Sequence, residues 1–261
     1  MREHHRRTVE RLVQQFAEDP RFPALIVGGS VARGWDKEDS DLDIILVATA
    51  EEYARRSPSG DFHYLATDVC DYPGGYVDGK VVDMAFLHDV AERGSEPARA
   101  AFVGAMLAYS RIPGLQETLS AIPVYPQREQ KSRLESFHAQ VLAMRWYMGE
   151  ADKRDNRYLR MHVASDLVLY GGRMILAHNR ILYPYHKWLL KALSEAPLKP
   201  QGLMERIDEL LANPCRETAN RFCDCILGFT DWPAPPEGWA ARFMHDVEWP
   251  WRRGATPLAD W

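Results

Sequence analysis

Two short segments of the sequence carry residue types that can act together on phosphate groups. The first is Gly28-Gly29-Ser30, which follows the apolar run 24–27, and the second is Asp41-Leu42-Asp43, after ten intervening residues. Glycines directly after a strand let the backbone approach a bulky ligand, and a serine that begins a helix presents a hydroxyl and free amide groups to phosphate oxygens. The first segment therefore indicates half of a nucleotide site. A plain strand-to-helix turn is the alternative, because such a turn needs glycine without any ligand.

Asp41 and Asp43 supply two carboxylates side by side, since residues two apart on a strand point to the same face. Two carboxylates about 5 Å apart repel by roughly 3 kcal/mol at an effective dielectric near 20, and a cation between them removes this repulsion. Hard oxygen ligands favour Mg²⁺, with Mn²⁺ as an alternative. A solvated edge strand is the competing interpretation, because Glu38, Asp39 and Asp41 form an acidic run.

A third acid, Asp83, lies in the predicted strand 80–87, among mostly apolar neighbours. A buried lone carboxylate needs a partner. If this strand pairs with the one that carries Asp41 and Asp43, the three carboxylates can hold two metal ions roughly 3.5 to 4 Å apart. The enzymatic hypothesis depends on this meeting, because a side chain at position 83 far from the other two would leave only a fold assignment.

Together, Gly29-Ser30, the gap, Asp41-Leu42-Asp43 and a later strand aspartate resemble the signature of the DNA polymerase beta-like nucleotidyltransferase superfamily. The second half of the chain is similar to the helical half of kanamycin-type antibiotic nucleotidyltransferases. The motif match covers residues 27–44 and 81–85, whereas residues 126–229 are matched only in helical character. The resemblance is thus specific for the superfamily and not for the substrate.

The resemblance implies a role for each motif. Within the nucleotide-binding segment Gly28-Gly29-Ser30, the last two residues would hold the β- and γ-phosphates of a nucleoside triphosphate. Asp41 and Asp43 would bind both metal ions, and Asp83 would share one ion and help to deprotonate the attacking hydroxyl. The reaction would be an in-line attack of that hydroxyl on the α-phosphorus, with release of pyrophosphate.

Two cations could reach the triphosphate. Arg33 lies three residues after Ser30, with a plain surface arginine as the favoured alternative. Lys187 opens a predicted helix among aromatic residues, and the resemblance implies that a cation of the helical half contacts the triphosphate. That half could also supply a general base, Asp155 or Asp166, and the sequence does not choose between them, since Asp155 would serve equally well as an N-cap.

The elements that must position these residues change in character along the chain. Apolar periodicity in the first part predicts one helix and four strands, at residues 2–18, 24–27, 42–48, 62–70 and 80–87. The dipeptide Asp78-Gly79 before the last strand is typical of a hairpin turn. Five helices are predicted in the second part, at residues 137–148, 158–177, 187–193, 203–211 and 221–229.

We therefore expect an α+β protein in which a mixed nucleotidyltransferase sheet with flanking helices precedes a helical bundle. The expected domains are a catalytic domain at 1–124, a helical domain at 125–230 and a packed tail at 231–261 that is rich in tryptophan and proline. The tail could cover the acceptor cleft or form a homodimer contact, and simple packing is the conservative interpretation.

Composition limits the partners. The 261 residues include 32 Lys and Arg against 37 Asp and Glu, a net charge of -5, so a long nucleic acid is not expected as a partner. The longest nearly apolar stretch, 100–109, is about half of a bilayer span, and no signal-peptide core follows the first residues, so we expect no membrane partner and a cytoplasmic location. The four cysteines lack zinc-site spacing and are expected to be reduced thiols.

The predicted function is a metal-dependent nucleotidyltransferase with two Mg²⁺ ions. It would move a nucleoside monophosphate, AMP from ATP, to a hydroxyl of a small molecule such as an aminoglycoside-like compound, and this acceptor class rests on fold-level association. One alternative is a nucleotidyltransferase that adenylylates a protein. Another is a nucleotide-binding regulator or antitoxin-type partner that does not consume the triphosphate.

Overall fold

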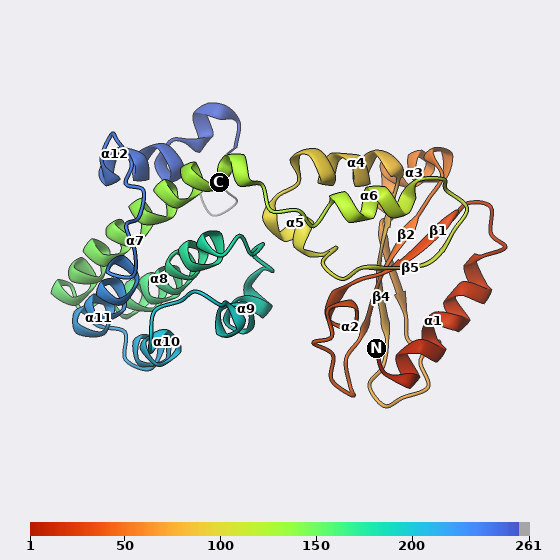
Figure 1. Cartoon of the computed structure of the whole chain (residues 1–261), viewed down its shortest axis with the longest axis horizontal. Helices are drawn as coiled ribbons and strands as arrows, with labels where there is room; N and C mark the ends of the chain where they lie inside the picture. Colours follow the sequence, from red (N-terminus) through yellow and green to blue (C-terminus); the bar gives the residue numbers. More distant parts are fainter. Residues whose placement is uncertain (256–261) are drawn as a thin grey trace. The chain divides into compact units, whose positions relative to one another are not determined.

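The computed structural model describes residues 1–255 (Figure 1), and the chain divides into two compact units. The first unit is Met1–Val124, and the second begins at Tyr125. The first contains a β-sheet with helices, and in the second the regular elements of the described residues are all helical. The predicted α+β class is confirmed.

A mixed five-stranded sheet forms the centre of the first unit, in the order β3-β4-β2-β1-β5. Its strands are β1 (Ala24–Val27), β2 (Leu42–Val47), β3 (His63–Ala66), β4 (Val77–Val82) and β5 (Met106–Ser110). Strands β2 and β4 run parallel, and the other neighbouring pairs are antiparallel. The parallel pair matters most for the site, because it places the same ends of both strands at one edge.

Alternation along β2 divides its side chains between two cores. Leu42 and Leu46 pack in one cluster with Phe16 of α1, whereas Ile45 and Val47 belong to a second cluster with residues of α4 and α6. Helices therefore cover both faces of the sheet (Figure 1). The helices of this unit are α1 (Glu3–Phe16), α2 (Gly29–Arg33), α3 (Ala50–Arg56), α4 (Met84–Arg93), α5 (Glu96–Ala100) and α6 (Leu115–Ala121), with a 3₁₀ turn at Ser57–Ser59.

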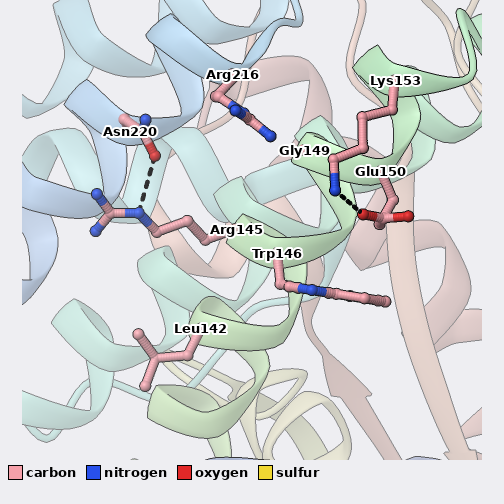
Figure 2. Close-up of a pocket in the computed structure, with 8 residues that line it drawn as sticks. All are labelled: Leu142, Arg145, Trp146, Gly149, Glu150, Lys153, Arg216 and Asn220. Atoms are coloured by element: carbon pink, nitrogen blue, oxygen red, sulfur yellow. Dashed lines mark hydrogen bonds and ion pairs between the residues drawn. The ribbon is translucent and has the colours of Figure 1, made fainter.

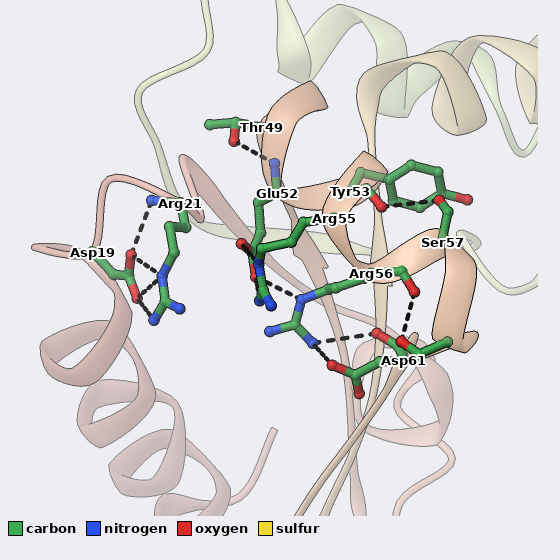
Figure 3. Close-up of polar contacts among 10 residues, drawn as sticks. Asp19, Arg21, Thr49, Glu52, Tyr53, Arg55, Arg56, Ser57 and Asp61 are labelled. Atoms are coloured by element: carbon green, nitrogen blue, oxygen red, sulfur yellow. Dashed lines mark hydrogen bonds and ion pairs between the residues drawn. The ribbon is translucent and has the colours of Figure 1, made fainter.

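Helix α3 is fixed by a compact set of polar contacts (Figure 3). The Thr49 hydroxyl caps its first turn by accepting from the Glu52 amide at 3.2 Å. The Glu52 carboxylate then accepts from Arg55 and Arg56, and Arg56 also reaches Asp61 at 2.8 Å. These hydrogen bonds, from Arg55 first and Arg56 next, lower the pKa of Glu52 to about 2.

Long helices form the second unit. They are α7 (Gln130–Lys153), α8 (Arg157–His178), α9 (Leu189–Glu195), α10 (Leu203–Ala212), α11 (Arg216–Leu227) and α12 (Trp239–Phe243), with 3₁₀ turns at Gln127–Glu129, His186–Trp188 and Pro250–Arg253 and a π-turn at Met244–Glu248. Helices α7 and α8 pack along each other and form the centre of the unit. All five helices predicted for this part are present.

Part of the described tail contacts α7, whereas Trp239, Trp249 and Trp251 of the same segment are exposed. The Arg242 guanidinium donates to the Ser132 carbonyl at 3.0 Å and to the Ser136 hydroxyl, and the Phe243 ring lies 6.0 Å from that of Tyr147. The Trp232 indole donates to the Ile226 carbonyl at 2.8 Å. Trp261, which belongs to the same predicted segment, lies outside the described residues.

The last predicted strand is shifted along the chain. It was expected at 80–87 and is observed at Val77–Val82, and the residues from Met84 onward belong to α4. The hairpin turn predicted at Asp78-Gly79 is wrong, because the strand continues through it. A Cβ at Gly79 would lie 2.8 Å from Ile44, so the glycine serves sheet packing and not a turn.

The remaining structural findings concern β5, the cysteines and the possibility of a membrane span. Strand β5 was not predicted, since its residues are all half-buried and show no alternation. All four cysteines are free thiols. Across residues 1–255, no helix combines the length and the apolar character that crossing a bilayer requires.

Candidate active site

The parallel register of β2 and β4 places two carboxylates opposite each other. Asp43 pairs with Asp78, one position after the pair of Leu42 with Val77. Leu42 and Val77 are buried in the core under α1, so Asp43 and Asp78 face the other side of the sheet. Asp41 directly precedes β2 and has the same parity as Asp43. Three acidic residues thus lie on one face at one end of two adjacent strands.

The glycine turn and Asp43 form one unit. The Gly28 amide donates to the Asp43 carbonyl at 2.9 Å, and Gly29 has a φ of 64°. A Cβ at Gly29 would lie 1.7 Å from Oδ2 of Asp43, so no other residue fits while this carboxylate keeps its place. The two motifs that the sequence separates by ten residues therefore touch.

Tyr76, which sequence reasoning missed, lies near Asp41, Asp43 and Asp78. A hydrogen bond with the Asp41 carboxylate raises the pKa of Tyr76 most, and the negative charges of Asp78 and Asp43 add to the increase. Tyr76 is therefore bound to Asp41 and lies within electrostatic range of Asp43 and Asp78. The sequence signal for Asp78 was the alternation of β4, in which Asp78 and Lys80 face opposite to Val77 and Val81.

Asp78 has a second partner that sequence reasoning also missed. The Nε2 atom of His63, on the antiparallel neighbour β3, lies 2.8 Å from Oδ1 of Asp78. Both side chains are well exposed, at 66% and 46%. Asp78 therefore lies between a histidine on one neighbouring strand and Asp43 on the other.

The backbone just before Asp41 is fixed by a buried histidine ring and a half-buried tyrosine ring. The Tyr72 hydroxyl donates to the Ser40 carbonyl at 2.8 Å, and Nε2 of His5 lies 3.2 Å from the same oxygen. His5 is fully buried on α1, and Asp36 lies 3.5 Å from its other ring nitrogen. The loop that leads into the acidic strand is thus held by α1.

The structure corrects the prediction for Asp83. The register of β4 places it five residues beyond Asp78, roughly 16 Å along the strand from the Asp43 pair. Its Oδ1 instead accepts from the Phe86 amide at 2.8 Å and caps α4. Asp83 therefore does not join Asp41 and Asp43, and the enzymatic hypothesis fails in the form that depended on Asp83. A different acid of β4, Asp78, lies opposite Asp43, so a metal site at this strand end would have to use Asp78 in place of Asp83.

The predicted phosphate-binding cations lie in different surroundings. The Arg33 guanidinium donates to the Ala100 carbonyl and lies 5.1 Å from the Trp35 ring, and burial lowers the pKa of Arg33. Ser30 is buried at the start of α2. Lys187 is exposed in the second unit, 5.5 Å from the ring of Trp188. The structure thus brings the glycines together with Asp43 and uses Arg33 to hold α2.

The two candidate general bases of the helical unit, Asp155 and Asp166, lie in different environments. Asp155 forms an ion pair with Arg160 at 2.8 Å, and its neighbour Asn156, not Asp155, caps α8. Asp166 is partly buried on α8, with Nε2 of His162 at 3.5 Å. Only Asp166 therefore keeps a carboxylate in a protected position.

The acids fit Mg²⁺ by type and strand position, but they do not converge on one point. Among residues 1–255, no group of three or more histidine, cysteine or acidic side chains is arranged to hold a metal ion. One reason is visible in the structure, because Asp78 is turned to His63. Three carboxylates at one strand end nevertheless provide the hard oxygen ligands that Mg²⁺ prefers.

Comparisons with known proteins do not assign this chain to a family. No protein-family model matches the chain, and no curated protein matches it. Among solved structures, it is similar to the crystal structure of a nucleotidyltransferase-like protein from Exiguobacterium sibiricum 255-15, with 11% identity and a TM-score of 0.46 over 95% of this chain and 79% of that one. A likeness this distant supports no inference about what the chain binds.

Proposed function

We propose that the first unit is a metal-dependent nucleotidyltransferase that moves a nucleoside monophosphate, AMP from ATP, to a hydroxyl of a small molecule. The observation that carries the proposal is the parallel register that places Asp43 opposite Asp78, next to a glycine turn in contact with the Asp43 carboxylate. An acidic edge beside a glycine turn combines ligands for a cation with space for phosphate.

Each of the candidate site residues would have a distinct role. Asp41, Asp43 and Asp78 would hold Mg²⁺, with Mn²⁺ as an alternative, and Gly28-Gly29-Ser30 would leave room for the triphosphate beside them. Bound metal would stabilise the entering and leaving oxygens of an in-line displacement. Asp78 takes the role that the sequence analysis gave to Asp83. It would accept the proton of the acceptor hydroxyl, with His63 orienting its carboxylate through the contact at 2.8 Å.

An aminoglycoside-like compound remains the nearest analogy, and the net charge of -5 suits a cationic acceptor without requiring one. Lys187 remains a candidate for contact with the triphosphate. Arg33 enters only as a support of α2, since its guanidinium is bound to a backbone carbonyl.

A second function is favoured by one observation. The described acids do not form a metal site, and Asp78 is paired with His63 instead. This arrangement suits a regulator that binds a triphosphate without consuming it. Such a protein would need the glycine turn but no convergence of the carboxylates.

One experiment separates the two functions. The purified chain is incubated with ATP labelled at the α-phosphate, Mg²⁺ and a panel of hydroxyl acceptors, and pyrophosphate and labelled product are measured. Binding of a non-hydrolysable ATP analogue is measured in parallel by calorimetry, with and without Mg²⁺. A transferase releases pyrophosphate and binds the analogue more tightly with Mg²⁺. A regulator binds the analogue but releases no pyrophosphate with any acceptor, and absence of binding excludes both.

A further inference from the structure

The helical unit contains a small cavity between α7, α8 and the tail. Its volume is about 200 Å³, and it is more enclosed than the open groove on α7 and α11 that Arg145, Trp146 and Arg216 line (Figure 2). Half of its ten lining residues have apolar side chains: Met144, Leu159, Val163, Phe243 and Val247. A cavity of about 150 Å³ can hold benzene, so this one has room for a single ring with a short arm.

One residue that lines this cavity carries a buried hydrogen-bond acceptor. Gln140 lies in the middle of α7 and is 3% exposed. Its Oε1 is buried and has no hydrogen-bond partner among the described residues. Such a lone acceptor costs free energy unless a donor reaches it, and Gln140 is one of the residues that line the cavity.

A carboxylate from the opposite helix lines the same cavity. Asp166 of α8 has a side chain that is only 22% exposed, and burial raises its pKa. His162, at 3.5 Å, is the one basic side chain among the lining residues, which include neither lysine nor arginine. His186, which does not line the cavity, also acts electrostatically on Asp166. Within the lining itself, Asp166 has His162 but no lysine or arginine beside it.

We propose that this cavity binds a small organic ammonium ion with an apolar body of about one ring. The ammonium group has three donors, which suit the Gln140 oxygen and the Asp166 carboxylate. The aromatic rings of Tyr147 and Phe243, 6.0 Å apart, add a face that attracts cations. The cavity is too small for an oligosaccharide amine. The site is independent of the nucleotidyl transfer proposed for the first unit.

The charge of the ligand provides the first test, on the unmodified chain. Binding of 2-phenylethylamine, 2-phenylethanol and phenylacetate is measured by calorimetry at one pH. The amine is expected to bind with one site per chain, the alcohol at least about tenfold more weakly, and the carboxylate not at all. Equal or tighter binding of the alcohol or the carboxylate, or no binding of the amine, overturns the proposal.

Variants then locate the site. Asp166→Asn is expected to weaken binding of the amine by at least about tenfold, and Gln140→Leu by a smaller factor. Asp208→Asn, an exposed acid on α10 that does not line the cavity, is the matched control and should leave binding unchanged. Equal effects of Asp166→Asn and Asp208→Asn overturn the proposal. Thermal unfolding confirms that each variant is folded, and the ligand series decides the question if one is not. ATP is absent throughout, so the result does not depend on the proposed transferase.

Discussion

The first unit holds its acidic residues in two contrasting ways. On α3, the Glu52 side chain is 4% exposed and accepts hydrogen bonds from Arg55 and Arg56 at 2.7–2.8 Å. At the ends of β2 and β4, no lysine or arginine within residues 1–255 lies in ion-pair distance of Asp41 or Asp78. Asp78 instead pairs with His63.

The difference separates structural acids from acids available to a ligand. Where a carboxylate is covered, the chain supplies its own cations and the pKa falls. Asp41 and Asp78 have no lysine or arginine of the described residues in ion-pair distance, so a cation from solution could balance their charge. Neutralising an acid should therefore lower stability on α3 and activity at the strand ends.

The largest expected effect is on catalysis. Asp78→Asn should lower nucleotidyl transfer, or Mg²⁺-dependent binding of the ATP analogue, by at least about a hundredfold, because it removes a metal ligand. Asp83→Asn, five residues along the same segment, is the matched control. It should leave transfer unchanged, since asparagine caps a helix as well as aspartate does.

The opposite pattern would reverse the assignment of the third acid. If Asp83→Asn abolishes transfer and Asp78→Asn preserves it, the site is not at the end of β4 that pairs with Asp43. Circular dichroism of both variants shows whether either effect is a loss of fold. With neither variant affected, the acids have no metal-binding role.

Gly29→Ala should show the next largest effect. The new methyl would lie 1.7 Å from the Asp43 carboxylate, and the backbone would keep a φ of 64°. We expect a loss of at least about 2 kcal/mol in the free energy of unfolding and loss of binding of the ATP analogue.

Gly34→Ala provides the control, because Gly34 has a similar φ of 72° and open space around its Cβ position. It should cost about 1 kcal/mol and leave binding intact. Urea denaturation and calorimetry measure the two quantities. Equal effects of both variants on binding would mean that the contact between Gly29 and Asp43 has no part in the site.

Removal of the cap at Asp83 should have a smaller effect, on stability alone. Asp83→Ala deprives the Phe86 amide of its acceptor and should lower the free energy of unfolding by about 1 kcal/mol. Urea denaturation measures this against Asp83→Asn, which keeps the cap. A cost as large in Asp83→Asn as in Asp83→Ala would show that the charge, not the hydrogen bond, is what α4 needs.

Much of the fold followed from local patterns. Strand β1 is observed at the residues predicted for it, because a short apolar run after Pro23 ends at a glycine. The helices of the second unit also followed from their periodicity, although α11 begins at Arg216, five residues before its predicted start. Strand β5 was missed because an evenly half-buried strand carries no alternation.

From the sequence, only the parts of the site formed by segments close together in the chain could be predicted. The sequence analysis treated the glycine turn and Asp43 as parts of one site from their chemistry, and the structure places Gly29 beside the Asp43 carboxylate. The third acid depends on which register β4 adopts against β2. That choice is made by long-range packing, with Val77 and Val81 buried under α1, and the local Asp78-Gly79 turn signal opposed it. Tyr76 and His63 were missed for the same reason.

The smallest expected effect is a pH dependence of stability at Glu52. It tests whether the covered acid of α3 stabilises the fold through its charge. Its pKa is lowered from 4.5 to about 2 in the folded chain, so its stabilisation is complete above about pH 4.5 and is lost as the pH falls through about 2. In Glu52→Gln, which cannot ionise, urea denaturation should show lower stability than the unmodified chain at pH 7. The difference should shrink between pH 4.5 and 2.

Glu51→Gln removes the same charge from the same turn without breaking a contact to arginine, and should show no such trend. A difference at Glu52 that does not change with pH would mean that packing of the side chain, and not its charge, stabilises α3.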